Sequence, residues 1–191
     1  STFKPFVYTA AIDNGYSPYY TLPDDTLTFT DPHTGKKWKP MNFTGTVSGE
    51  PLTLKNALVQ SKNTVTARLV QQVGPERVVS YAHRMGIESP LSAVPSIALG
   101  TSSVTLLEMT SAYTTLANRG LHSEPRLITR IEDRYGNVLA QFAPEREVAL
   151  SEQTAYTMVD MMRGAIAPDG TGFRIRSQYG IDHDVIGKTG T

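Results

Sequence analysis

The sequence of 191 residues contains no cysteine, which excludes disulfide bonds, thiolate nucleophiles and cysteine-type zinc sites. It also carries no net charge, because 18 lysine and arginine residues balance 18 aspartate and glutamate residues. A balanced charge gives no reason to expect nucleic acid or an anionic membrane surface as a partner. No apolar run approaches the roughly 18 residues that a membrane-spanning helix needs. The length suits one ordinary domain or part of a larger one.

Patterns that bind metals are also missing. The four histidines are scattered, and none stands in an HExxH or His-x-His spacing. We therefore expect neither a metal site nor a cofactor.

Helical signals dominate what is present. Apolar residues recur at helical spacing between capping and breaking residues, and Thr105-Leu106-Leu107-Glu108 has the pattern of a capping box. We expect helices over residues 1–14, 52–61, 64–73, 76–85, 105–120 and 151–166.

Strand signals are fewer. Alternation on both sides of Tyr135-Gly136-Asn137 predicts a β-hairpin from Leu127 to Phe142, and residues 184–188 indicate the start of another strand. Residues 16–50 are rich in Pro, Gly, Asp and Thr, which predicts short strands and turns, with Trp38 and Phe43 anchoring this loop to the body.

The tetrapeptide Ser1-Thr2-Phe3-Lys4 is the first candidate site. Pro5 fits only the first turn of a helix, which places Ser1 and Lys4 at a helix N-terminus, and residues three apart share one face. A neutral lysine amine can activate a serine hydroxyl. Burial and neighbouring cations favour the neutral amine, and Lys62 and Lys188 are the candidate cations.

Two further motifs combine similar groups. Ser61-Lys62-Asn63 lies between two predicted helices, where its hydroxyl and amide can relay a proton and hold a peptide carbonyl, although a polar turn would look the same. Glycine inside the predicted strand Lys188-Thr189-Gly190-Thr191 is typical of close approach by a ligand, although an ordinary edge strand also fits.

In this order, the three motifs resemble the Ser-x-x-Lys, Ser-Asp-Asn and Lys-Thr-Gly set of serine β-lactamases and penicillin-binding proteins. The chain most resembles the transpeptidase domain of class A, bifunctional penicillin-binding proteins. The resemblance covers nearly the whole chain, because it extends to WKPMNFTGTVSGEPLTLKNALVQSKN, GTSSVTLLEMTSAYTTLANRG, RIEDRYGNVL and DGTGFRIRSQYG. It implies an α+β fold of the β-lactamase/D,D-peptidase type, with a helical cluster packed beside an antiparallel sheet.

The resemblance also implies catalytic roles. Ser1 would be the acylated nucleophile and Lys4 the base that takes its proton. Ser61 would shuttle a proton to the leaving amine, Asn63 would hold the substrate backbone and Lys4, and Lys188 would supply positive charge near Ser61.

Substrate binding is implied for the last motif. Thr189 and Thr191 would bind the terminal carboxylate, with Gly190 allowing close approach. The backbone N–H groups of Ser1 and Thr191 would form the oxyanion hole.

The activity implied is a D,D-transpeptidase that cross-links peptidoglycan stem peptides through an acyl-serine intermediate and is inhibited by β-lactams. The parent protein would be anchored in the membrane at the extracytoplasmic face of a bacterial cell, with a glycosyltransferase domain upstream. Residues 1–191 would form a partial domain that lacks the outer strands and terminal helices of the family fold. The sheet would then be incomplete, and we expect the isolated segment to fold poorly and to have little activity.

The sequence alone leaves other functions open. A serine at position 1 would suit an N-terminal-nucleophile hydrolase, but that class gives Lys4 and the two later motifs no role. Within the superfamily, a penicillin-recognising sensor and a D,D-carboxypeptidase share the same motifs. A class A β-lactamase would normally have Ser-Asp-Asn where this sequence has Lys62 in the middle.

Overall fold

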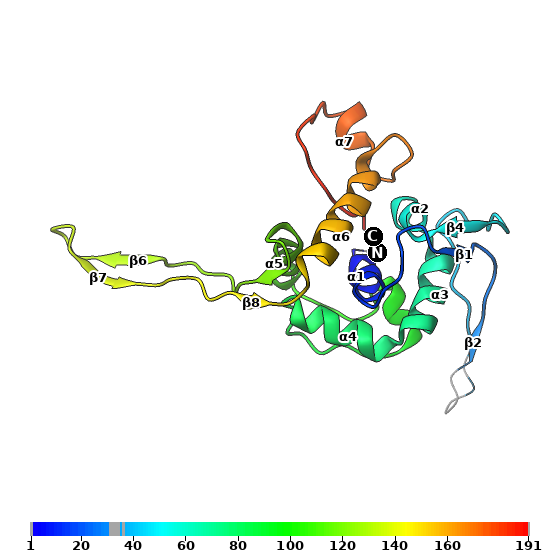
Figure 1. The fold of residues 1–191 in the computed structure, drawn as a ribbon, viewed down its shortest axis with the longest axis horizontal. Coiled ribbons are helices and arrows are strands. Elements are labelled where there is room, and N and C mark those ends of the chain that lie inside the picture. The colour runs from blue at the N-terminus through cyan, green and yellow to red at the C-terminus, as the bar shows by residue number, and fades with distance from the viewer. Residues whose placement is uncertain (1, 31–34, 36, 191) are drawn as a thin grey trace.

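Helix α1 (Lys4–Asp13) lies at the centre of the molecule, with the other helices around it (Figure 1). The computed structural model describes residues 2–30, 35 and 37–190. All side chains of α1 from Lys4 to Ala11 are buried, as expected for a helix that is covered on every face. The remaining helices are α2 (Leu54–Val59), α3 (Asn63–Val73), α4 (Pro75–Arg84), α5 (Leu106–Ala117), α6 (Glu152–Arg163) and α7 (Arg174–Ser177), with 3-10 turns η1 (Pro95–Leu99) and η2 (Gly164–Ile166).

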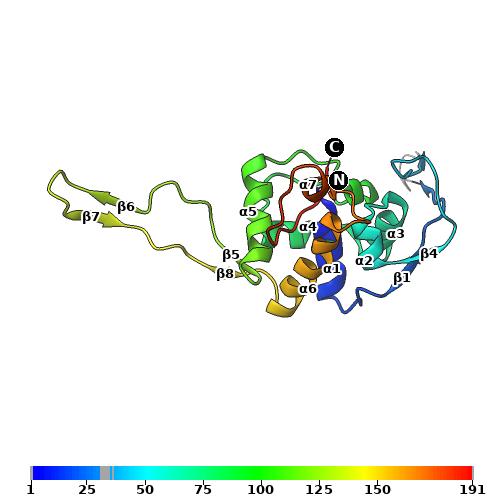
Figure 2. The same cartoon turned by 90° about the horizontal axis from the view of Figure 1, so that it is seen from above.

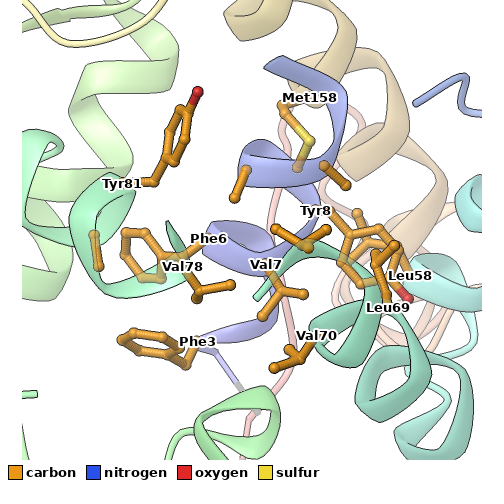
Figure 3. Packing of buried hydrophobic residues seen from close by; sticks show 14 of the residues in the cluster. Phe3, Phe6, Val7, Tyr8, Leu58, Leu69, Val70, Val78, Tyr81 and Met158 are labelled. Atoms are coloured by element: carbon orange, nitrogen blue, oxygen red, sulfur yellow. The ribbon is translucent and has the colours of Figure 1, made fainter. Parts of the chain in front are cut away.

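The hydrophobic core forms where α1 meets α2, α3, α4 and α6. Side chains of this core are drawn in Figure 3, which labels Phe3, Phe6, Val7, Tyr8, Leu58, Leu69, Val70, Val78, Tyr81 and Met158. Because side chains from four other helices pack on α1, the position of this helix is fixed by several elements at once.

Local sequence signals account for the helix ends. Thr53 caps α2 through the Asn56 N–H, as predicted. Thr105 and Glu108 form the predicted capping box at the start of α5. The six predicted helices are confirmed, with small differences at their ends.

The strands form two-stranded antiparallel ladders. The pairs are β1 (Thr21–Pro23) with β4 (Pro51–Thr53), β2 (Phe29–Thr30) with β3 (Lys37–Trp38), β5 (Leu121–His122) with β8 (Glu147–Val148), and β6 (Arg130–Glu132) with β7 (Val138–Gln141). The α+β class is confirmed, but the described residues form no single sheet beside the helices. The predicted hairpin is present as β6 and β7, and it projects from the body as an arm (Figure 2).

Two predictions, one of a strand and one of a buried side chain, are wrong. Residues 184–190 are not assigned to a strand, because a strand requires backbone hydrogen bonds to a neighbour and no described strand pairs with them. Phe43 does not anchor its loop, since its side chain is 95% exposed. Trp38 does pack against the core, with its ring centroid 5.1 Å from that of Phe29.

None of the helices described over 2–30, 35 and 37–190 has the length and apolar character that crossing a bilayer requires.

Candidate active site

The amine of Lys4 is the centre of the candidate site. Lys4 is the first residue of α1, and its side chain is fully buried. Its Nζ donates to Asn63 Oδ1 at 2.6 Å, to the Ser61 carbonyl oxygen at 2.6 Å and to Ser61 Oγ at 3.1 Å. Two of the three motifs, almost sixty residues apart in the sequence, therefore meet at one nitrogen atom.

The environment favours a neutral amine at this position. Burial, together with the positive charge of Lys188, lowers the pKa of Lys4 from 10.5 to about 7. Burial also lowers the pKa of Lys188, to about 8. Lys4 can therefore lose its proton near neutral pH, whereas an ordinary lysine is almost wholly charged there.

Ser61 reaches Lys4 because the chain takes a left-handed turn where α2 ends. The φ angle of Ser61 is 55°, a conformation that usually belongs to glycine. The Ser61 N–H bonds to the Leu58 carbonyl and the Lys62 N–H to that of Ala57, the two bonds of a Schellman motif. A serine in this conformation costs on the order of 1 kcal/mol, and such strain is found most often at functional sites.

Lys62, the other candidate cation, points elsewhere. Its Nζ lies 2.9 Å from Oδ2 of Asp24, a fully buried carboxylate. Of the two cations that the sequence suggested, Lys188 is the one that acts on Lys4.

The segment 188–190 completes the arrangement. A Cβ atom added to Gly190 would lie 2.6 Å from Thr2 Cγ2, so this segment runs directly against the residue that precedes α1 by two positions. The hydroxyl of Thr189 lies 2.7 Å from that of Thr171, and Lys188 Nζ donates to the Thr189 carbonyl oxygen at 3.0 Å. The beginning of the described chain and its end are therefore in contact.

A cavity of about 460 Å³ opens beside these groups. Its lining includes residues of the second and third motifs together with the loop before α2. They are Asn42, Phe43, Thr44, Gln60, Ser61, Lys62, Asn63, Thr171, Thr189 and Gly190. A volume of this size suits a peptide terminus or a small molecule.

The whole chain matches one protein family. A family described as "Penicillin binding protein transpeptidase domain" matches residues 1–191. The chain belongs to this family. The class A likeness is also confirmed, because penicillin-binding protein 1A of Pseudomonas aeruginosa is 42% identical over 156 residues, covering 81% of this chain and 19% of the relative.

Solved structures of transpeptidase domains resemble this one. Penicillin-binding protein 1A from Haemophilus influenzae has a TM-score of 0.92 at 28% identity, covering all of this chain and 34% of that one. The PonA1 protein from Mycobacterium tuberculosis in complex with penicillin V has a TM-score of 0.73 at 25% identity, covering 85% of this chain and 45% of that one. The chain spans about a fifth to a quarter of the length of the curated relatives it matches.

Most of the residues predicted for the site of this transpeptidase domain lie together. They are Lys4, Ser61, Asn63, Lys188, Thr189 and Gly190. The other two, Ser1 and Thr191, lie outside the described residues.

Sequence reasoning missed three polar residues of the transpeptidase domain. Asp24, which follows β1, and Asn42, which follows β3, hold the second motif from about twenty to forty residues earlier, and Thr171 bonds to Thr189. Asn42 and Thr171 carry a signal, because each lies within a stretch that resembles the family. No spacing rule links Asp24 to Lys62, so only the fold reveals that pair. No group of three His, Asp or Glu residues in the described part of the chain is arranged to hold a metal ion.

Proposed function

We propose that this transpeptidase domain is a serine-type D,D-transpeptidase that cross-links peptidoglycan stem peptides and is trapped by β-lactams. One observation carries the proposal. A buried lysine amine with a pKa of about 7 bonds to Ser61 and Asn63, at the start of the helix that follows Ser1. Such an amine can act as a base near neutral pH, which a serine nucleophile needs.

The acylation step uses the first two motifs. Ser1 Oγ attacks the carbonyl carbon between the two terminal D-alanines of a stem peptide, and neutral Lys4 takes the hydroxyl proton. The C–N bond then breaks, and the leaving D-alanine amine receives a proton through Ser61. The distance of 3.1 Å between Lys4 Nζ and Ser61 Oγ supports this route, because it allows direct proton transfer.

Substrate recognition uses Asn63 and the last motif. Asn63 Oδ1 accepts a hydrogen bond from Lys4 Nζ, and Asn63 Nδ2 donates one of its two N–H groups to the Met41 carbonyl oxygen. The second N–H can then donate to a substrate carbonyl. Lys188 supplies positive charge, and Thr189 and Thr191 bind the terminal carboxylate beside Gly190. The backbone N–H groups of Ser1 and Thr191 form the oxyanion hole.

The acyl-enzyme is then resolved by an amine of a neighbouring stem peptide, which attacks the ester carbonyl and releases Ser1. A β-lactam follows the first half of this route and stops there. Penicillin V is bound by PonA1, a structural relative at 25% identity, which supports the same ligand class for this chain.

The cellular setting follows from the same proposal. The relatives are much longer bacterial proteins, so we place residues 1–191 inside a larger transpeptidase domain whose outer strands and terminal helices lie beyond this segment. The parent protein is then anchored in the cytoplasmic membrane, carries a glycosyltransferase domain upstream and works on the extracytoplasmic face.

The alternatives within the superfamily are a D,D-carboxypeptidase, which uses water as acceptor, and a penicillin-recognising sensor. A test mixes the natural full-length protein with a donor stem pentapeptide and an amine acceptor. We expect cross-linked product and released D-alanine. Hydrolysed donor without cross-links indicates a carboxypeptidase, and neither product indicates a sensor.

The nucleophile is tested with a fluorescent penicillin. Ser1→Ala abolishes labelling, whereas Ser177→Ala on the exposed surface of α7 leaves it unchanged. Stoichiometric labelling of Ser1→Ala would show that another residue is acylated.

A further inference from the structure

Asp24 lies outside all three motifs and collects an unusual number of hydrogen bonds. Its carboxylate is fully buried and accepts from five donors. Oδ1 receives Thr64 Oγ1 at 2.5 Å and Asn42 Nδ2 at 2.8 Å. Oδ2 receives Lys62 Nζ at 2.9 Å, Ser48 Oγ at 3.1 Å and the Ser48 N–H at 3.2 Å.

Only a carboxylate can satisfy this set of donors. An ionised carboxylate is acceptor-only, whereas the amide of an asparagine would turn two N–H groups toward donors. Burial alone would raise the pKa of Asp24, but the hydrogen bonds from Thr64, Asn42 and Lys62 outweigh it and hold the pKa well below its usual range. The side chain is therefore charged at every pH at which the site works.

Two chains of contacts lead from Asp24 to the site. The first is direct, because Lys62 is the middle residue of the second motif. The second runs through Asn42, whose Oδ1 accepts the N–H of Asn63 at 2.9 Å and that of Thr64 at 3.3 Å. These contacts cap the start of α3, which its own N-cap residue Lys62 leaves without a side-chain bond.

The end of the second chain of contacts is the amine of Lys4, since Asn63 Oδ1 accepts from Lys4 Nζ at 2.6 Å. Lys62 also lines the cavity beside Ser61. If its counter-ion were lost, its ammonium would be free to turn toward Ser61 and Asn63 and compete with Lys4 for them. Asp24 holds that charge away from the two side chains.

We infer that Asp24 is a positioning residue for acylation, which through Lys62 and Asn42 fixes the segment 61–63 against Lys4. The inference rests on the acyl transfer proposed above. Asp25 provides a matched control. Its carboxylate also pairs with a cation of α3, Arg68, but within the described part of the chain it makes no hydrogen bond or ion pair with the segment 61–63.

The experiment measures acylation of the natural full-length protein by a chromogenic penicillin, with stopped-flow rates at saturation and titration of the acylated fraction. We expect Asp24→Asn to lower the acylation rate per titratable site by about 10- to 100-fold, because misplacing reacting groups by about 1 Å can cost that much. The final labelled fraction and the ligand affinity change little. Asp25→Asn keeps the wild-type rate.

A purely structural role gives a different result. It would lower the melting temperature and the labelled fraction of Asp24→Asn while leaving the rate per site unchanged, and that result overturns the inference. If Asp24→Asn does not fold, the pair Lys62→Met and Asn42→Ala decides, because each breaks one of the two chains of contacts and leaves Asp24 four of its five donors. We expect the rate per site to fall at least about threefold in one of them, and unchanged rates in both refute the positioning role. Failure of the wild-type protein to be acylated would instead refute the proposed function.

Discussion

The ionisation of Lys4 makes a quantitative prediction for the pH dependence of acylation. With a pKa of about 7, Lys4 is about 1% neutral at pH 5 and about 90% neutral at pH 8. If its neutral amine is the base, the acylation rate at saturating penicillin rises about 90-fold over this range and then levels off. Lysine with its ordinary pKa of 10.5 would give a rate that still rises tenfold per pH unit at pH 8.

The ionisation of Lys188 adds a decline at high pH to the predicted pH dependence. Its pKa of about 8 means that it loses its charge above that pH, and the binding of a ligand carboxylate then weakens. The ratio of the acylation rate constant to the ligand dissociation constant should therefore be bell-shaped, with a maximum between pH 7 and 8. Because the two lysines interact, the rise and the decline describe the pair and not either residue alone.

Stopped-flow mixing with a chromogenic penicillin from pH 5 to 9 measures both quantities, with the rate of spontaneous β-lactam hydrolysis subtracted. Lys4→Arg should be inactive throughout, since a guanidinium stays charged. A wild-type rate that is flat with pH, or one that rises without a plateau up to pH 9, would refute the assignment of Lys4 as the base.

The same ionisation predicts a stability effect of known sign. The pKa of Lys4 is lower in the folded than in the unfolded chain, so the unfolded chain binds more protons between pH 7 and 10.5. The free energy of unfolding therefore rises with pH in that window, by up to about 1.4 kcal/mol per pH unit from this group. Urea unfolding at pH 7 and pH 9 should show a smaller rise for Lys4→Met, and an equal rise would contradict the lowered pKa.

Three substitutions test other parts of the site. Gly190→Ala should slow acylation at least about tenfold, because the Cβ atom of the new alanine meets Thr2 Cγ2. Adding Thr2→Ser, which removes that methyl group, should restore the rate. If the rate is not restored, this contact is not the cause. Phe43→Ala should leave the melting temperature unchanged, because this side chain is exposed. It should weaken the binding of benzylpenicillin about threefold to tenfold more than the binding of a penicillin that lacks the aromatic side chain. Met41→Ala, at a residue that does not line the cavity, should change neither quantity. Ser61→Gly should slow acylation. The free energy of unfolding should stay equal or rise by up to about 1 kcal/mol, because glycine tolerates the left-handed conformation of this position. A large loss of stability would argue against strain at Ser61.

Local signals predicted much of the fold. Thr53, the Thr105–Glu108 capping box and the turn around Gly136 each act within a few residues, so the sequence alone identifies them. The meeting of the motifs could not be worked out from spacing. It was predicted only because the three motifs in this order resemble a known family.

The predictions that failed depend on long-range packing. A propensity for the strand at 184–188 has no effect without a neighbouring strand to bond to, and the neighbours of a strand are set by the whole fold. An aromatic side chain is usually buried, but Phe43 is exposed and lines a cavity. The residues around Phe43 in the sequence do not distinguish a buried position from a cavity wall. The pairing of Lys62 with Asp24 joins residues 38 positions apart, which no local pattern records.

The account as a whole requires that the groups gathered around Lys4 serve a single reactive hydroxyl, that of Ser1. Mass spectrometry of the natural full-length protein after reaction with penicillin and proteolysis measures this directly. We predict one penicilloyl adduct per chain, on the peptide that contains Ser1 and Lys4. An adduct on any other residue, such as Ser61, or no adduct at all, would contradict the account.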